Sequence, residues 1–471
     1  MRSGVLCLCL AGIAGGQIAR VDPLERMLHD ANQMRARGQY GEADKLYTAA
    51  VEAAERLPPT DARLAKALNN LAALRHEQGR YAEAESIYKR GLAIWEATLG
   101  PEDSRVASIL NNLGEVYRVQ GRYAEAEDHY KRALEIRERI LREAPVGVAS
   151  SLNSLGLLEQ QKGNFSSAES LQTRALSFNE QALGQEHLNV SINLNNLAEL
   201  YRIQGRYSEA EPHYHRALAI KKRILGDDHP DVATTLNNYG VLLHGRGDLG
   251  RSAEIHRDAL AIRERVLGPE HPNVAVSLNN LASLRRAEGK RDEAARLFER
   301  ALAIWEKTFG PEHPNIAGAL NNLAELRQLN GEWAEAEPLY RRSLGILEKT
   351  LGPEHVETAR VLHNLGILFM NQDKPSGAER LFRRALMIYE KRLGPNHVSL
   401  APMLEGLGMA YARQRRFTEA EAMFLRLRET LGPSHPEVAR TLSAYAASLR
   451  QARQDAEADR IEKYMKSLRS Q

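Results

Sequence analysis

The chain has 471 residues, more than one hydrophobic core usually organises, so it holds either several domains or a fold that grows by stacking units. Its 43% hydrophobic and 27% charged residues are ordinary for a globular protein, and a net charge of +3 does not favour a nucleic-acid partner. Both cysteines, Cys7 and Cys9, lie near the start, so the rest of the sequence has no disulfide, thiolate nucleophile or cysteine-bound metal.

Residues 1–19 have the pattern of a secretory signal peptide. A single Arg2 precedes an apolar run from Val5 to Ala14, and small residues follow. We therefore expect an exported protein, periplasmic or secreted. A start codon assigned too early would produce the same pattern, and the protein would then be cytoplasmic. No other stretch is apolar enough to cross a membrane, so we expect no membrane insertion of the mature chain.

From residue 20 to residue 471 the sequence is a single array of repeats. The leucine that opens each Leu-Asn-Asn block, or its equivalent, recurs every 42 residues, at Leu68, Leu110, Leu152, Leu194, Leu236, Leu278, Leu320, Leu362 and Leu404. One more unit flanks these nine on each side, which gives about eleven. Their expected bounds are 24–57, 62–100, 104–142, 146–184, 188–226, 230–268, 272–310, 314–352, 356–394, 398–432 and 436–469.

Each unit predicts two helices joined by a glycine turn. In the unit 188–226, residues 190–204 form a first helix whose apolar stripe is Leu194, Leu197, Ala198 and Tyr201. Gly205 ends it, and residues 208–225 form a second helix with the stripe Ala210, Tyr214, Ala217 and Leu218. One hairpin cannot bury both faces of its helices, so neighbouring units must stack. The sequence therefore predicts an all-α solenoid of helical hairpins.

Three local departures from the repeat carry further expectations. The segment "FLRLRETLG" has lost four residues from a second helix, and Pro402 should delay the start of a first helix. A histidine recurs in the linkers, at His187, His229, His271, His313, His355, His397 and His435. One histidine per unit cannot converge on a metal, so we expect these rings to start helices or to pack, and we expect no metal site.

The segment "NNLAELYRIQGRYSEAEPHYHRAL", residues 195–218, resembles a tetratricopeptide repeat. The 42-residue period and the "LGPEHPxVA" linker are similar to the subclass found in kinesin light chains and nephrocystin. The resemblance covers about residues 24–469, although the heptads that precede the repeats in kinesin light chains are missing. It implies a right-handed superhelix with the first helices on its concave face. It also implies that the second asparagine of each pair contacts a peptide backbone.

Paired asparagines recur on the first helices, on opposite flanks of the face turned away from the apolar stripe. The second members are Asn70, Asn112, Asn196, Asn238, Asn280, Asn322 and Asn364; the first members are Asn69, Asn111, Asn153, Asn195, Asn237, Asn279 and Asn321. An amide both donates and accepts, so such a row suits the backbone of an extended peptide. The alternatives are that these side chains tie neighbouring hairpins together or are simply solvated.

Other positions of the same face vary from unit to unit, as positions that set specificity would. Arg118, Arg202 and Arg286 could hold acidic partner side chains, or could be solvated. Glutamates accompany them at Glu115, Glu199 and Glu325. Towards the C-terminus the face becomes apolar, with Ile367, Met370 and Met409. We therefore expect one end of the groove to be polar and the other to accept apolar anchors.

No catalytic constellation and no phosphate-binding loop is legible, so we expect neither enzymatic activity nor a cofactor. The sequence favours a monomeric scaffold that binds an extended peptide or a partner protein's tail in the concave groove. Two alternatives remain: a self-assembling structural protein, and a regulator that docks on an enzyme. The polar C-terminal segment "DAEADRIEKYMKSLRSQ" has the character of a capping helix and speaks against open-ended stacking.

Overall fold

The computed structural model describes residues 22–58, 61–140, 145–433 and 435–469, so the expected signal segment 1–19 lies outside the described residues. This part of the chain contains 22 α-helices, one short 3-10 helix and no strand. The helices are α1 (Pro23–Ala36), α2 (Tyr40–Ala54), α3 (Ala62–Glu77), α4 (Tyr81–Leu99), α5 (Ser104–Val119), α6 (Tyr123–Arg139), α7 (Pro145–Gln161), α8 (Phe165–Leu183), α9 (Leu188–Ile203), α10 (Tyr207–Leu225), α11 (Pro230–Arg246), α12 (Leu249–Leu267), α13 (Pro272–Ala287), α14 (Arg291–Phe309), α15 (Pro314–Leu329), α16 (Trp333–Thr350), α17 (Val356–Asn371), α18 (Pro375–Leu393), η1 (Val398–Leu400), α19 (Ala401–Arg413), α20 (Phe417–Leu431), α21 (Pro436–Gln451) and α22 (Asp455–Arg469).

The helices pair into eleven hairpins, which confirms the predicted all-α solenoid. In the hairpin of α9 and α10, both predicted apolar stripes are buried. Ala198 and Ala210 are completely buried, and their small side chains allow the two helices to approach closely. Trp95 and Trp305 are also buried, as packing residues of second helices.

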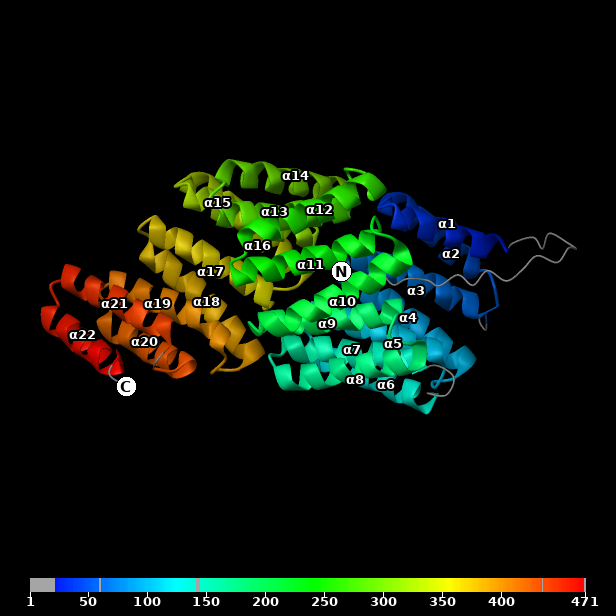
Figure 1. Ribbon diagram of the computed structural model, residues 1–471, viewed down its shortest axis with the longest axis horizontal. Helices are drawn as coiled ribbons and strands as arrows, with labels where there is room; N and C mark the ends of the chain where they lie inside the picture. The colour runs from blue at the N-terminus through cyan, green and yellow to red at the C-terminus, as the bar shows by residue number, and fades with distance from the viewer. Residues whose placement is uncertain (1–21, 59–60, 141–144, 434, 470–471) are drawn as a thin grey trace, which may run out of the picture.

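The hairpins stack in chain order, and Figure 1 shows the resulting coil running from α1 at one end to α22 at the other. Each second helix packs against the first helix of the next repeat, and successive first helices also contact one another. First helices of successive repeats lie closer to one another than the second helices do. The first helices are therefore on the inner side of the curve. The asparagine pairs, which lie on first helices, therefore belong to this inner side.

The linker histidines start the helices that follow them. At each of the seven positions the ring Nδ1 accepts a hydrogen bond from the backbone N–H two residues later, as in the 3.1 Å bond from Asn315 to His313. Asp22, Asp61 and Asp103 do the same for earlier first helices. A side chain that accepts from a free N–H stabilises the start of a helix, so the predicted role in helix initiation is confirmed.

The repeat is least regular near the C-terminus, as the sequence predicts. Val398–Leu400 form the 3-10 turn η1, and α19 begins only at Ala401, one residue before Pro402. Helix α20 has 15 residues, whereas α18 has 19. The helix α22 covers the last core with Ala458 and Ile461, which are both buried.

A long-range contact joins successive turns of the coil. The turns between first and second helices in early repeats pack against linker histidines about 234 residues later, between five and six repeats of 42. We call this contact the seam; its pairs are Gly38 with His271, Gly79 with His313, Gly121 with His355, and Gly163 with His397. An added Cβ on Gly79 would lie 2.5 Å from Cδ of Pro314, so the seam leaves no room for a side chain there.

The seam combines aromatic packing with hydrogen bonds to the backbone. The ring of His313 stacks on Phe309 at 4.1 Å between centroids, and Tyr40 of an early repeat lies 5.0 Å from Phe309. The Nε2 atom of His313 lies 2.9 Å from the carbonyl oxygen of Glu77, and Arg392 Nη1 donates to the carbonyl of Gly121 over 2.9 Å. The edge of one turn of the coil is thereby fixed to the edge of the next turn of the coil.

Candidate functional site

The asparagine pairs on the inner face form a hydrogen-bonded ladder between repeats. The second asparagine of one repeat donates from Nδ2 to the Oδ1 of the first asparagine of the preceding repeat. These bonds are Asn112 to Asn69 (3.0 Å), Asn196 to Asn153 (2.7 Å), Asn238 to Asn195 (3.1 Å), Asn322 to Asn279 (3.1 Å) and Asn364 to Asn321 (2.9 Å). The asparagines therefore tie neighbouring hairpins together, which is one of the alternatives that the sequence left open.

The ladder changes where its composition changes. Ser154 replaces the second asparagine of one repeat, and there Asn111 donates to the serine Oγ over 3.1 Å. Asn237 is turned away, because its Nδ2 donates to Ser277 Oγ over 2.7 Å and its Oδ1 pairs with His256 Nδ1 at 3.0 Å. Among the described residues, Asn280 consequently makes no ladder bond.

The ladder leaves part of each amide available. The seven second asparagines are half-buried, whereas Asn153, Asn237 and Asn321 are buried. A ladder bond uses one of the two amide hydrogens of a second asparagine, and the amide has another hydrogen and a carbonyl oxygen. Asn112, Asn196, Asn238 and Asn322 thus combine a structural bond with unused hydrogen-bonding capacity on the inner face, whereas Asn364 also donates to Glu325.

The predicted arginines are held by glutamates of the same face. Arg118 donates from Nε to Glu115 over 2.8 Å, and Arg202 makes the equivalent bond to Glu199, also over 2.8 Å. Arg118 is mostly buried; the bond to Glu115 raises its pKa above the ordinary value, although burial alone would lower it. These charges are neutralised inside the protein, so a partner's acidic group would have to compete with a glutamate.

A polar cluster joins α13, α15 and α17. Arg286 pairs with Glu325 of the next repeat, and Glu325 also accepts from Asn364 over 2.8 Å and from Asn321 over 3.2 Å. One carboxylate therefore links a predicted arginine to two predicted asparagines from neighbouring repeats. The sequence placed these residues on one face, but it could not show that Glu325 bridges them.

A hollow of about 210 Å³ lies beside this cluster, at the point where the inner face becomes apolar. It is lined by Glu325, Gln328, Leu329, Tyr340, Asn364 and Ile367. Ile367 is 37% exposed and Leu329 is 56% exposed, so both offer apolar surface to a visitor. Of the other predicted anchors, Met370 and Met409 are partly buried and pack against the core.

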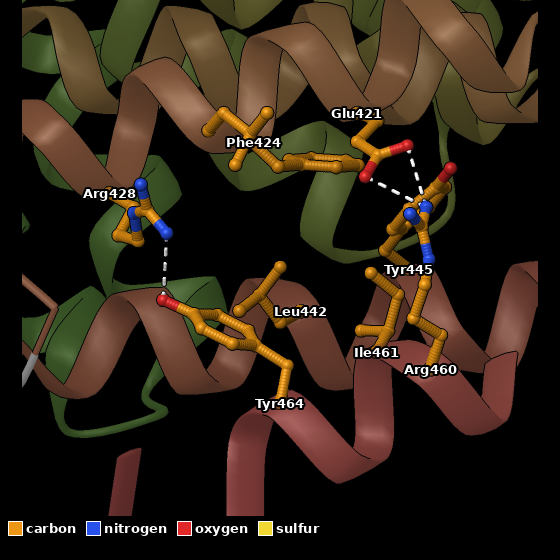
Figure 2. A pocket seen from close by; sticks show the side chains of 9 residues that line it. Glu421, Phe424, Arg428, Leu442, Tyr445, Arg460, Ile461 and Tyr464 are labelled. Atoms are coloured by element: carbon orange, nitrogen blue, oxygen red, sulfur yellow. Dashed lines mark hydrogen bonds and ion pairs between the residues drawn. The ribbon is translucent and has the colours of Figure 1, made fainter. Parts of the chain in front are cut away.

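A second hollow of about 210 Å³ lies in the last two repeats, between α20, α21 and α22 (Figure 2). Phe424, Leu442 and Ile461 give it apolar walls, as Figure 2 shows. Two polar contacts span it: Arg460 pairs with Glu421 at 2.8 Å, and Arg428 Nη1 donates to Tyr464 Oη over 3.0 Å. These contacts fasten the final helix to the array.

Two further findings concern the described residues alone. No three His, Cys, Asp or Glu side chains among them gather into a group that could hold a metal ion. None of their helices has the length and apolar character needed to span a membrane.

The tetratricopeptide repeat profile matches the chain in nine overlapping segments, 31–97, 63–139, 105–181, 147–222, 189–265, 246–307, 274–326, 315–391 and 369–429. The chain belongs to the tetratricopeptide repeat family. Tetratricopeptide arrays are protein-interaction folds, so this array is expected to have protein partners. No curated protein matched the chain.

Solved structures similar to this tetratricopeptide array include BtubC (BKLC) from P. vanneervenii. It is 23% identical, with a TM-score of 0.41, and the match covers 48% of this chain and 90% of that chain. Another is a kinesin light chain candidate from Podosopora anserina with nearly identical TPR-like repeats. It is 26% identical, with a TM-score of 0.38, over 44% of this chain and 99% of that chain.

Proposed function

We propose that this tetratricopeptide protein is a non-enzymatic scaffold that binds an extended peptide or a partner protein's tail along the inner face of its first helices. The observation that carries the proposal is the row of half-buried second asparagines, all of which except Asn364 have unused hydrogen-bonding capacity. A peptide backbone needs a partner for every N–H and C=O group, and repeated amides supply both kinds. Because each hydrogen bond contributes only about 0.5–1.5 kcal/mol, binding would use several repeats together.

The hollow at Ile367 supports an orientation for the guest. An apolar side chain of the peptide would occupy it, between Leu329 and Tyr340. The Arg286–Glu325 pair beside it would contact polar neighbours of that side chain. The proposed ligand is therefore an extended segment with one apolar anchor at the end that faces the later repeats.

A random peptide library displayed on phage tests this binding mode. Peptides selected on the wild-type chain should lose at least about tenfold in affinity for the Asn280→Ala and Ile367→Arg variants, since a tenfold loss corresponds to about 1.4 kcal/mol. Asn280 is chosen because it makes no ladder bond, so its loss should leave the fold intact. Helical circular dichroism controls for folding, and Met387→Arg, at a 62% exposed side chain of a second helix, is the matched surface control. Equal binding by all variants would exclude the inner face.

We propose that the scaffold is a monomer. Its alternative, self-assembly through the end repeats, predicts a mass that grows with protein concentration. Light scattering after size-exclusion chromatography should instead give the mass of one chain, 52.6 kDa less any removed signal, across a hundredfold range of concentration. A docking regulator would also be monomeric, but it would compete for its enzyme with the peptides selected from the library.

We also propose export, on the sequence of residues 1–19 alone. The protein purified from its native source should begin after residue 19. An N-terminus at Met1, or one at a later internal methionine in a cytoplasmic fraction, would contradict this proposal.

A further inference from the structure

All four seam histidines accept a cap hydrogen bond at Nδ1, and His313 also uses its second ring nitrogen. In His313, Nδ1 accepts from the N–H of Asn315 over 3.1 Å, while Nε2 faces the Glu77 carbonyl oxygen at 2.9 Å. A ring that accepts at Nδ1 and donates at Nε2 is neutral. His271, His355 and His397 have the same cap, and their rings pack against the turns at Gly38, Gly121 and Gly163. The geometry of the seam therefore requires uncharged imidazoles.

The chain contains its own comparison for these rings. His271, His313 and His355 are buried, whereas His229 and the fourth seam ring, His397, are half-buried. All of these rings cap a helix, but the ring of His229 does not pack against an adjacent turn of the coil. Burial lowers the pKa of His313 to about 4, and it also lowers the pKa of His271, His355 and His397. What distinguishes the seam rings is the contact between turns.

Few charges face these rings. Arg263 acts on His271 and disfavours its protonation. Glu357 and Arg392 act on His355 in opposite senses, after burial. The pKa of His313 is shifted by burial, which lowers it, and by the Glu77 carbonyl, which raises it. The pKa of His397 is lowered by burial. The Arg35–Glu77 ion pair lies on the same early turn as the Glu77 carbonyl, at 2.6 Å between its charged atoms. Among the described residues, Glu357 is the one carboxylate that acts on a seam ring to offset a positive charge there.

We propose that the seam is a proton-sensitive clasp, which holds successive turns of the coil together at neutral pH and releases them when its histidines are protonated. A proton on Nδ1 removes the acceptor of the cap and places a positive charge at the positive end of a helix dipole. In His271, His313 and His355 it also places that charge in a buried contact. Separation of the turns exposes the ring to water and relieves the burial. The stacking of each hairpin on its neighbours does not involve these contacts, so the helices persist while the coil lengthens.

Small-angle X-ray scattering of the full chain at pH 7.5 and at pH 4.5 tests the clasp. The radius of gyration should increase at the lower pH, with the transition between about pH 4 and 6.5, while the helical circular dichroism is unchanged. A variant with His271, His313, His355 and His397 all changed to Gln should lose this pH-dependent step. The control variant, with His187 and His229 changed to Gln, should retain it.

Three results would overturn the proposal: an unchanged radius in the wild type, a step that persists in the fourfold variant, or a step lost in the control. If the fourfold variant loses its helical signal, single variants carry the test. His313→Gln and His355→Gln should then each reduce the step more than His187→Gln does, and equal effects would refute the clasp.

Discussion

The asparagine pair shows how one residue type can serve two purposes at the same position. Asn238 ties its repeat to the preceding one through Asn195, yet it remains half-buried on the inner face. Helical spacing predicted the position of both side chains. It could not predict the bond, because the bond depends on the rotation between neighbouring hairpins and not on the sequence of either one. The exception at Asn237, which turns to His256 and Ser277, was equally hidden.

This difference within the ladder gives a prediction for single residues. Asn238→Ala removes a cross-repeat hydrogen bond and leaves the Asn195 carbonyl without it, so it should destabilise the chain by about 1–2 kcal/mol. Asn280→Ala removes no ladder bond and should change stability by less than about 0.5 kcal/mol. Urea unfolding followed by circular dichroism measures both. Equal losses would mean that the ladder contributes nothing to stability.

At the scale of helices and turns, the sequence was a good guide to structure. The apolar stripes, the glycine turns, the late start of α19 and the short α20 all follow from local chemistry, because each depends on neighbours within one repeat. The linkers also make local contacts: Glu270 pairs with Lys307 at 3.0 Å, and Glu354 pairs with Lys391 at 2.6 Å, each between a linker and the second helix of the repeat that follows it. These pairs are exposed, so each contributes little.

Two glycines in hairpin turns distinguish the stability cost of a left-handed backbone from the cost of disturbing the seam. Gly79 and Gly331 both have a left-handed backbone, with φ of 72° and 80°, but only Gly79 packs against the adjacent turn of the coil. Gly331→Ala should cost about 1 kcal/mol, the penalty for a Cβ in this conformation. Gly79→Ala should cost more, because its Cβ would collide with Pro314. Thermal unfolding of the two variants compares them, and a smaller loss for Gly79→Ala would argue against the seam.

At the scale of the whole molecule, the sequence was silent about the seam. The contact spans between five and six repeats, so it has no counterpart in the 42-residue period. Its one visible sign was the recurring histidine, whose role in starting helices was expected and whose contact with another turn was not. That contact depends on the rotation that accumulates over several hairpins. This rotation cannot be predicted from the sequence of any single repeat.

Buried histidines make the stability of the whole array depend on pH. Burial lowers the pKa of His256 to about 4, with a smaller contribution from His244. An unfolded histidine takes up a proton near pH 6.5, so between about pH 4 and 6.5 the unfolded chain binds more protons. The free energy of unfolding therefore keeps the full contribution of a neutral His256 above about pH 6.5, and it falls as the pH is lowered towards 4. The urea midpoint should be lower at pH 5 than at pH 7.5.

His256→Gln should reduce that difference in midpoint. The substitution has a precedent in the chain, because Gln172 occupies the equivalent position of α8 and is also buried. His256 packs within the hairpin of α11 and α12, away from the seam, so this variant leaves the coil contacts unchanged. An unaltered pH dependence would assign the effect to other groups.

The seam also determines how the molecule responds to force. An open coil of hairpins stretches like a soft spring, since small rotations between units add up over its length. With adjacent windings fastened edge to edge, tension applied at the two ends must first part those windings. A pulling experiment should therefore meet a stiff initial regime, then a yield, and only afterwards the compliant extension typical of a free spring.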